Sequence, residues 1–242
     1  MPQFHLKCEA TDIAPYVMLV GNPQRAEQTA LLLEDARLVN NYRYLLVYTG
    51  MSQGQRVTVA TTAMGAPSTA IVVEELCNLG ARVLLRVGSA GGIAPDVDTG
   101  DIVIATGSIR DEGTTPQYLP MTFPAVPDFD LLRLVMDTAH SVKADVKHGV
   151  VISRDSFYRN YGDEEMQLML RCGVQAIEME SSCVFVVGQY RGVRTSALFA
   201  VDGSVTKGAI KPQGAEELFK TAERQTIQIG LSVLAACAGA GF

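Results

Sequence analysis

Residues 83–92 read Val-Leu-Leu-Arg-Val-Gly-Ser-Ala-Gly-Gly, an apolar strand pattern that leads directly into a glycine-rich turn. Residues 17–25 and 60–67 repeat this order, because each passes from apolar residues through a glycine to the proline of a helix start. In a parallel α/β sheet the carboxyl ends of the strands collect ligands, and the free N–H groups at a helix start attract anions. The three segments therefore predict an α/β fold with an anion-binding edge.

Short apolar runs alternate with longer helical patterns along the chain, which indicates parallel strands joined by helical crossovers. Asn22 is a good N-cap before Pro23, while Pro67 and Gly80 mark the start and the end of the next helix. Strands are expected at about residues 15–20, 44–49, 56–61, 82–87, 101–107, 147–153, 174–178 and 194–201. Helices are expected at about residues 23–33, 68–79, 128–142, 163–172, 181–190 and 214–237.

The composition is that of a globular chain, with 242 residues of which 48% are apolar and 19% charged. No linker rich in Gly, Ser or Pro and no internal repeat interrupts it, so we expect a single domain over residues 1–242. The chain has 20 Lys and Arg against 26 Asp and Glu, a formal charge of −6 without a block of like charge. This balance disfavours nucleic acid or an anionic membrane as a partner, whereas a small anion needs only two or three local arginines.

The cysteine and N-terminal patterns indicate a cytoplasmic protein. The five cysteines are odd in number, widely spread and free of any C-x-x-C pair, so neither a disulfide framework nor a zinc ribbon is expected. The N-terminus lacks the basic and apolar regions of a signal peptide, and the weakly polar run over residues 229–242 is too short to span a bilayer. The three histidines are scattered, so we expect no metal site.

Charged residues at predicted strand ends are the candidates for chemistry. Arg86 ends an apolar run, where an unpaired guanidinium is costly, so it faces either a bound anion or a carboxylate within the sheet. Arg25 lies in the first turn of a helix, where it either binds the same anion or is solvated. Glu178 and Glu180 lie where a strand passes into a helix, and Glu178 either faces a ligand, caps the helix or pairs with an arginine. Asp202 precedes a glycine, so it either faces the ligand or forms an ordinary Asp-Gly turn.

Common nucleotide-binding and hydrolase motifs are absent from the sequence. The turn at residues 88–92 is not a G-x-G-x-x-G fingerprint, and neither a P-loop nor a G-x-S-x-G elbow is present. A dinucleotide-dependent oxidoreductase is therefore the weaker alternative at the level of the fold. Paired carboxylates are also compatible with a glycosidase, whose geometry the sequence does not define.

Seven short motifs occur in one order along the chain: Gly21-Asn-Pro-Gln-Arg25, Asn41-Tyr-Arg43, Met64-Gly65, Arg86-Val-Gly88-Ser89-Ala-Gly91, Ser156-Phe157-Tyr158, Glu178-Met179-Glu180 and Asp202. Their order and approximate spacing resemble those of the hexameric purine nucleoside and uridine phosphorylases. The resemblance implies a single three-layer α/β/α domain around a central mixed, partly closed β-sheet. It also implies a homohexamer, a trimer of dimers in which neighbouring subunits share active sites.

The resemblance assigns a role to each motif. Phosphate would be bound by Gly21, Arg25, Arg86 and Ser89, with Arg43 reaching over from the neighbouring subunit. The ribose would contact Met64, Met179, Glu180 and the neighbour's His5, and the base would contact Phe157, Glu178 and Asp202. Forked guanidinium groups and backbone N–H groups suit the desolvation and aiming of inorganic phosphate, which is a weak nucleophile.

Phosphorolysis of this kind needs a proton donor and no cofactor, because inorganic phosphate is itself the co-substrate. Asp202 is the candidate general acid for the departing base. The resemblance gives Arg224 as the arginine of the last helix that assists this acid, with Lys207 or Lys211 as alternatives because the intervening stretch is longer than in the purine pattern. A nucleosidase that uses water, or a nucleoside-binding protein on an inactive scaffold, is disfavoured by the three arginines and the intact carboxylates.

The identity of the base is the least determined feature. Uridine-specific members carry a Gln-x-Arg pair shortly after the Phe-Tyr, and residues 159–164 read Arg-Asn-Tyr-Gly-Asp-Glu without it. Residues 109–113 and 123–128, in contrast, resemble the uridine enzymes at least as well, and Asn22 stands where many relatives carry Asp. We expect a purine nucleoside as substrate, with uridine as the alternative.

Overall fold

The computed structural model describes residues 2–159, 162–207 and 214–242. Its strands are β1 (Tyr16–Val20), β2 (Glu34–Asn40), β3 (Val47–Ser52), β4 (Gln55–Thr61), β5 (Val83–Gly92), β6 (Ile102–Asp111), β7 (Val146–Arg154), β8 (Ala176–Glu178) and β9 (Arg194–Ser204). Its helices are α1 (Pro23–Ala30), α2 (Ala66–Asn78), α3 (Phe129–Ser141), α4 (Asp163–Arg171), α5 (Ser181–Arg191) and α6 (Glu216–Ala240), with short 3₁₀ turns η1 (Tyr42–Tyr44) and η2 (Thr115–Gln117).

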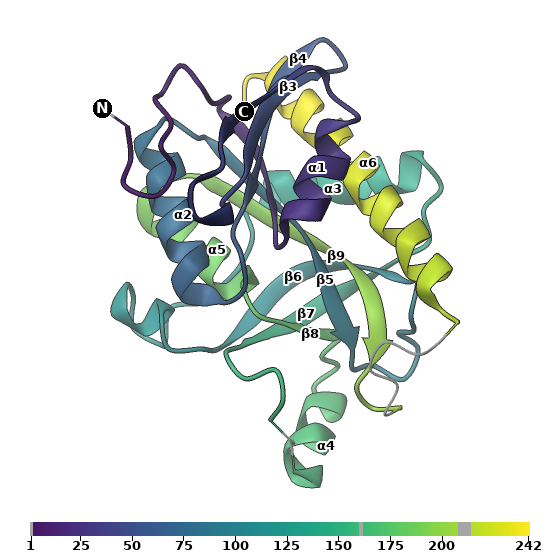
Figure 1. Cartoon of the computed structure of the whole chain (residues 1–242). Helices are drawn as coiled ribbons and strands as arrows, with labels where there is room; N and C mark the ends of the chain where they lie inside the picture. Colours follow the sequence, from purple (N-terminus) through teal and green to yellow (C-terminus); the bar gives the residue numbers. More distant parts are fainter. Residues whose placement is uncertain (1, 160–161, 208–213) are drawn as a thin grey trace.

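The strands form one mixed sheet in the order β2-β3-β4-β1-β5-β8-β7-β6-β9. Because β5 also pairs with β9, the strands β5, β8, β7, β6 and β9 close into a ring, and β1 to β4 extend from it as an open sheet (Figure 1). Strand β1 is parallel to β4 and β5, and β5 is parallel to β9, whereas β3 is antiparallel to both β2 and β4. The predicted mixed, partly closed sheet is therefore confirmed.

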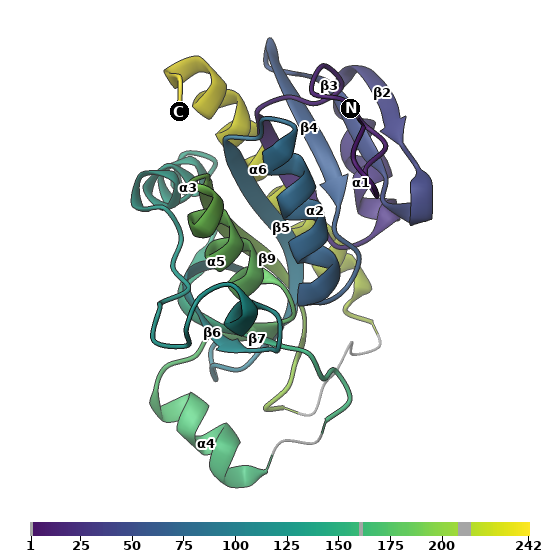
Figure 2. The same ribbon diagram turned by 90° about the vertical axis from the view of Figure 1, so that its left-hand side faces the viewer.

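Helices cover the sheet on both faces, as the predicted α/β/α layers require. Helices α2 and α5 lie together on one side, and α1, α3 and α6 lie on the other (Figures 1 and 2). Successive side chains of a strand point to opposite faces, so Val17 and Leu19 of β1 enter the apolar cluster under α2 and α5. Met18 and Val20 enter the cluster under α3 and α6. Arg86 falls between the apolar residues of β5 in the middle of this assembly.

The sequence prediction missed one strand and misjudged the extent of others. Strand β2 has mostly exposed side chains and begins Glu-Asp-Ala-Arg, so it has no apolar alternation to indicate it. It is an edge strand whose register against β3 is interrupted. Strands β5 and β9 continue several residues beyond the predicted ends, because their pairing with each other extends through the glycine-rich segment to Gly92 and Ser204.

The described residues contain neither a membrane-spanning helix nor a metal-binding cluster. None of the helices in the part of the chain that the structure describes is long and apolar enough to cross a membrane. Over the same residues, no group of three or more His, Cys, Asp or Glu side chains is placed to bind a metal ion.

Candidate functional site

Strand pairing brings the first two predicted phosphate-binding arginines together. Parallel pairing of β1 with β5 sets Leu19 opposite Arg86, so the turn after β1 lies beside the middle of β5. The side chain of Asn22 caps α1 by accepting a hydrogen bond from the Arg25 N–H at 2.7 Å. Arg25 is buried, and it donates from Nη2 to Ser89 Oγ at 2.6 Å and from Nη1 to the Val87 carbonyl at 3.1 Å.

Arg86 is buried in β5 and faces two carboxylates. Its Nη2 forms an ion pair with Glu180, and its Nε lies 3.4 Å from Glu178 Oε2. Its Nη1 has no hydrogen-bond partner among the residues that the structure describes. Gly88 makes room for this guanidinium, because a Cβ at that position would lie 3.0 Å from Arg86 Nη2 and 2.8 Å from the Phe199 ring. Both interpretations of Arg86 from the sequence thus have support: it is paired within the sheet, and it keeps one buried donor group unused.

Glu180 connects this arginine to the loop before α2. Its Oε1 accepts a hydrogen bond from the backbone N–H of Gly65 at 2.7 Å. Gly65 has a φ of 87°, a left-handed conformation that favours glycine, and this directs its N–H towards the carboxylate. Burial raises the pKa of Glu180, and the positive charge of Arg86 acts in the opposite direction. The half-buried Met179 precedes Glu180 in the same turn.

The carboxylate of Glu178 accepts hydrogen bonds from several neighbouring groups. Its carboxylate accepts from the hydroxyl groups of Ser153 and Ser181 and from the backbone N–H groups of Glu180 and Ser181. Together with the contact to Arg86, these bonds fix the passage from β8 into α5. The predicted capping and pairing of Glu178 are therefore both present in the structure.

Asp202 lies within β9 rather than in a free turn. Ala90 of β5 is opposite Val201, and Gly91 is opposite Gly203, so Asp202 is the additional residue of a β-bulge. A bulge redirects a side chain and is common next to active sites. Burial lowers the pKa of Arg25, and the nearby negative charges of Glu223 and Asp202 raise it.

Glu223 is a member of this cluster that the sequence prediction missed. Its Oε1 lies 2.7 Å from Arg25 Nε, and both side chains are largely buried. The sequence did contain a signal, because Glu223 precedes the buried residues Thr226, Ile227 and Gly230 by three, four and seven positions. That spacing places it on the inward face of α6.

Other predicted site residues lie outside this cluster in a single chain. Arg43 is exposed in η1, with its guanidinium 5.6 Å from the centre of the Tyr42 ring. His5 Nδ1 lies 2.8 Å from Glu75 Oε1, and the His5 backbone N–H donates to the same carboxylate. Arg224 is exposed on α6 and lies 3.3 Å from Thr221 Oγ1.

The remaining predicted residues are also at the surface or outside the described structure. Met64 is 81% exposed and Phe157 is 53% exposed, with the Phe157 ring edge-on to Tyr158. Lys207 is exposed and paired with Asp98, and Lys211 lies outside the described residues. The structure of one chain therefore brings together Arg25, Arg86, Ser89 and Glu180, whereas Arg43, Met64, Phe157 and Arg224 are exposed.

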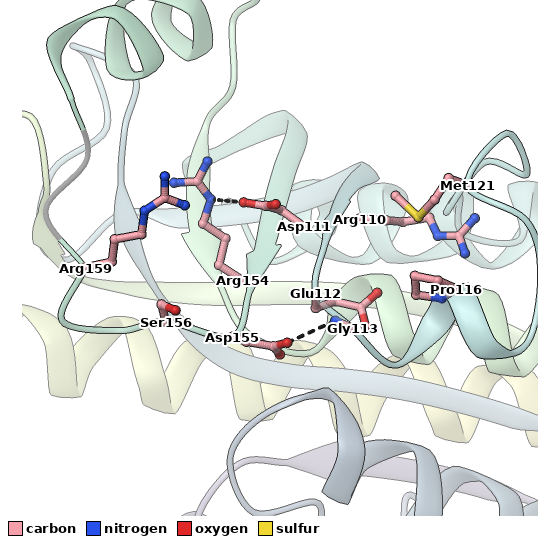
Figure 3. Close-up of a pocket in the computed structure, with 10 residues that line it drawn as sticks. All are labelled: Arg110, Asp111, Glu112, Gly113, Pro116, Met121, Arg154, Asp155, Ser156 and Arg159. Carbon is pink, nitrogen blue, oxygen red and sulfur yellow. Dashed lines mark hydrogen bonds and ion pairs between the residues drawn. The ribbon is translucent and has the colours of Figure 1, made fainter.

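A cavity of about 410 Å³ opens at the ends of β6 and β7 (Figure 3). Arg154 and Arg159 lie at one end of it and Arg110 at the other, with carboxylates between them. These arginines have partners within the chain: Arg110 donates to three backbone carbonyls, and Arg154 pairs with Asp111 at 2.6 Å. The lining residues are Arg110, Asp111, Glu112, Gly113, Pro116, Met121, Arg154, Asp155, Ser156 and Arg159.

A buried hydrogen-bond chain connects this cavity to the arginine cluster. Glu112 accepts from Ser182 Oγ at 3.2 Å, and the Ser182 N–H donates to Ser153 Oγ at 2.9 Å. Ser153 in turn donates to Glu178, the partner of Arg86. The cavity and the cluster are thus neighbouring parts of one polar region at the strand ends.

Two buried guanidinium groups thus lie among carboxylates beside β5 of a partly closed α/β sheet. The chain belongs to the phosphorylase superfamily, whose sequence model matches residues 15–237, and within it to the nucleoside phosphorylases.

Known relatives include enzymes for both kinds of base. The chain is 40% identical to a uridine phosphorylase from Treponema pallidum over 226 residues, which cover 89% of this chain and 86% of the relative. It is 34% identical to a guanosine phosphorylase from Halorubrum lacusprofundi, with 97% and 98% covered. The crystal structure of a purine nucleoside phosphorylase from Toxoplasma gondii in complex with immucillin-H superposes with a TM-score of 0.93 at 28% identity, covering 99% of this chain and 97% of that one. The predicted family and fold are confirmed.

Proposed function

We propose that this chain cleaves the N-glycosidic bond of purine nucleosides with inorganic phosphate, giving the free base and pentose 1-phosphate. A phosphate oxygen forms the new bond to the anomeric carbon while the bond from that carbon to the base nitrogen breaks. The bonding electrons leave with the base, which gains a proton. The observation that carries the proposal is Arg86 Nη1, a buried cationic donor group without a partner among the described residues, close to a second buried arginine.

The free donors of the two arginines suit a phosphate ion. A guanidinium has five N–H groups, and Arg25 uses three of them on Glu223, Val87 and Ser89. Among the described residues, one N–H on each terminal nitrogen of Arg25 is therefore left without a partner, in addition to those on Arg86 Nη1. Forked donors of this kind bind phosphate oxygens in pairs. Gly21 supports the same role, because no atom lies within 4 Å of a Cβ built there and a ligand can approach the backbone.

Glu180 and Asp202 supply the remaining chemistry. Glu180 is held by Gly65 and Arg86, so its carboxylate is fixed where a sugar hydroxyl can donate to it. Asp202 projects from the bulge beside β5, close enough to Arg25 to affect its pKa, and we assign it as the general acid. A purine can take this proton at N7, an atom that uracil does not have. No cofactor takes part in this scheme.

The charges in one chain support a site that a second copy completes. The carboxylates of Glu178, Glu180, Asp202 and Glu223 outnumber the guanidinium groups of Arg25 and Arg86 around the proposed phosphate position. A phosphate dianion needs further positive charge there. The exposed Arg43 of a neighbouring chain would supply it, with His5 reaching the ribose, as in a trimer of dimers with shared sites.

The test is a panel of nucleosides assayed with and without phosphate. Wild-type protein should cleave inosine, guanosine or adenosine only when phosphate is present, and Arg86→Ala should lower kcat/KM for phosphate by about a hundredfold or more. Arg133→Ala is a matched control, because Arg133 is an exposed arginine paired only loosely with Asp130. Equal cleavage in phosphate-free buffer would identify a nucleosidase instead.

Uridine is the second candidate substrate, and one observation favours it. The Treponema relative with 40% identity is a uridine phosphorylase. Comparing wild-type kcat/KM for uridine with that for inosine, guanosine and adenosine decides between the two substrates. A strong preference for uridine would replace the purine assignment and leave phosphorolysis intact.

A further inference from the structure

We propose that Glu223 is a positioning residue that aims the guanidinium of Arg25 at the phosphate ion. The inference rests on the proposed function, because it concerns the phosphate half of that site. Arg25 lies in the first turn of α1, and Glu223 lies on α6, 198 residues away in sequence. Their contact at 2.7 Å therefore joins two helices that are otherwise separate parts of the chain.

The contact uses the side of the guanidinium that phosphate does not need. Glu223 accepts from Nε, whereas the Val87 carbonyl and Ser89 Oγ each accept from one terminal nitrogen. These three bonds from three directions fix the plane and the rotation of Arg25. The N–H groups that remain are on the two terminal nitrogens, which is the paired arrangement that binds two oxygens of one phosphate.

The electrostatics of the contact favour the charged form of Arg25. Burial lowers the pKa of Arg25, and the charge of Glu223 and its hydrogen bond are the largest effects in the opposite direction. Without Glu223, the buried Arg25 would lose its main counter-charge and one of its three hydrogen-bond acceptors. The Arg25 side chain would then rotate towards water or towards Asp202. Its two terminal N–H donors would no longer point at the same phosphate ion.

Glu223 is distinct from its neighbours on the helix. The next residue, Arg224, is exposed, and Glu217, six residues before Glu223, pairs with Lys220 at the surface. Glu223 itself lies with Ala222 and Thr226 on the buried face of α6. Glu217 therefore offers a control that changes the same residue type on the same helix without touching Arg25.

The experiment compares phosphate and nucleoside kinetics of Glu223→Ala, Glu223→Gln and Glu217→Ala. Glu223→Ala should raise KM for phosphate about 10- to 100-fold, the usual effect of losing a hydrogen bond to a charged group, while KM for the nucleoside changes less than about twofold. Glu223→Gln keeps an acceptor for Nε and should recover part of the loss, and Glu217→Ala should match wild type. Should the alanine variant fail to fold, Glu223→Met removes the acceptor at similar volume.

A double variant shows whether Glu223 acts through Arg25. If it does, Glu223→Ala should have almost no further effect on KM for phosphate in an Arg25→Ala background, because the effects of residues in one network are not additive. The proposal is overturned if KM for phosphate is unchanged in Glu223→Ala, or if the full effect persists without Arg25. An unchanged KM in Arg25→Ala itself would instead refute the proposed phosphate site.

Discussion

Replacing Arg86 with methionine perturbs the most buried ionic contacts of the site. Arg86, Glu178 and Glu180 have side chains that are only 3%, 1% and 5% exposed. Removing one partner of a buried ion pair costs about 3–5 kcal/mol, because the other charge stays behind without compensation. A domain of this kind is stable by about 5–15 kcal/mol, so the Arg86→Met variant should lose a large part of its stability.

The stability that is lost in Arg86→Met should increase with pH. Burial raises the pKa of Glu180, and Arg86 opposes that rise. Without Arg86 the pKa of Glu180 in the folded protein should rise further above its value in the unfolded chain. A carboxyl group with a raised pKa contributes stability at low pH, and this contribution is lost as the pH rises through the folded-state pKa. The loss is about 1.4 kcal/mol when the folded and unfolded pKa values differ by one. The variant should therefore be closest to wild type in mild acid.

Urea denaturation followed by far-UV circular dichroism measures the free energy of unfolding of wild type and of Arg86→Met at each pH. At equal protein concentration, the free energy lost in Arg86→Met should be about 3–5 kcal/mol at pH 8 and clearly smaller at pH 5.5. The double variant Arg86→Met/Glu180→Gln carries no titrating group at position 180, so its deficit should vary less between the two pH values. A deficit that is equal at both pH values, or larger at pH 5.5, would refute the argument.

Three further predictions concern the acid, the shared site and the cysteines. Asp202→Asn should lower kcat for purine phosphorolysis by about a hundredfold or more with little change in phosphate affinity, whereas a purely structural role predicts a lower Tm and a normal kcat in the folded fraction. Mixing Arg43→Ala chains with Arg25→Ala chains should restore part of the activity through hybrid sites, and no recovery despite demonstrated subunit exchange would show that each site is complete in one chain. Cys172 is exposed and should react first with a thiol reagent at pH 8. Burial raises the pKa of Cys77 to about 11, so only about one thiol in a thousand is ionised there, and equal labelling rates in a Cys172→Ser variant and wild type would contradict this.

The predictable part of the fold was the part with local signals. Residues 83–92 and the cap at Asn22 mark strand ends and helix starts by residue type alone, and the structure places β5 and α1 there. The ring of five strands has no such signal, because it depends on β9 pairing with both β5 and β6 across the fold. Edge strand β2 was missed because its side chains are mostly exposed and therefore lack the alternation of apolar residues that a half-buried strand shows.

Asp202 shows how strand register decides what a local motif means. The sequence Val-Asp-Gly at residues 201–203 is compatible with an ordinary turn at the end of a strand, and nothing nearby distinguishes the alternatives. In the structure the strand continues to Ser204, because Gly91 and Gly92 of β5 continue to pair with it. The aspartate then becomes the additional residue between two paired positions. Its orientation is therefore set by a partner strand more than a hundred residues earlier in the chain.

Residues that touch a ligand and residues that hold them in place are recognised from different kinds of information. Arg25 and Arg86 could be proposed as phosphate-binding residues from short motifs, because a binding residue needs its neighbours in sequence to form the turn that presents it. Glu223 could not be assigned in that way, because it needs only a position on the inward face of a helix that crosses Arg25. Arg43 is the converse case: its motif is recognisable, but the role that we propose for it requires a second copy of the chain. A single sequence thus indicates candidate ligand-binding groups more readily than the contacts that orient them, since those contacts come from packing between distant elements.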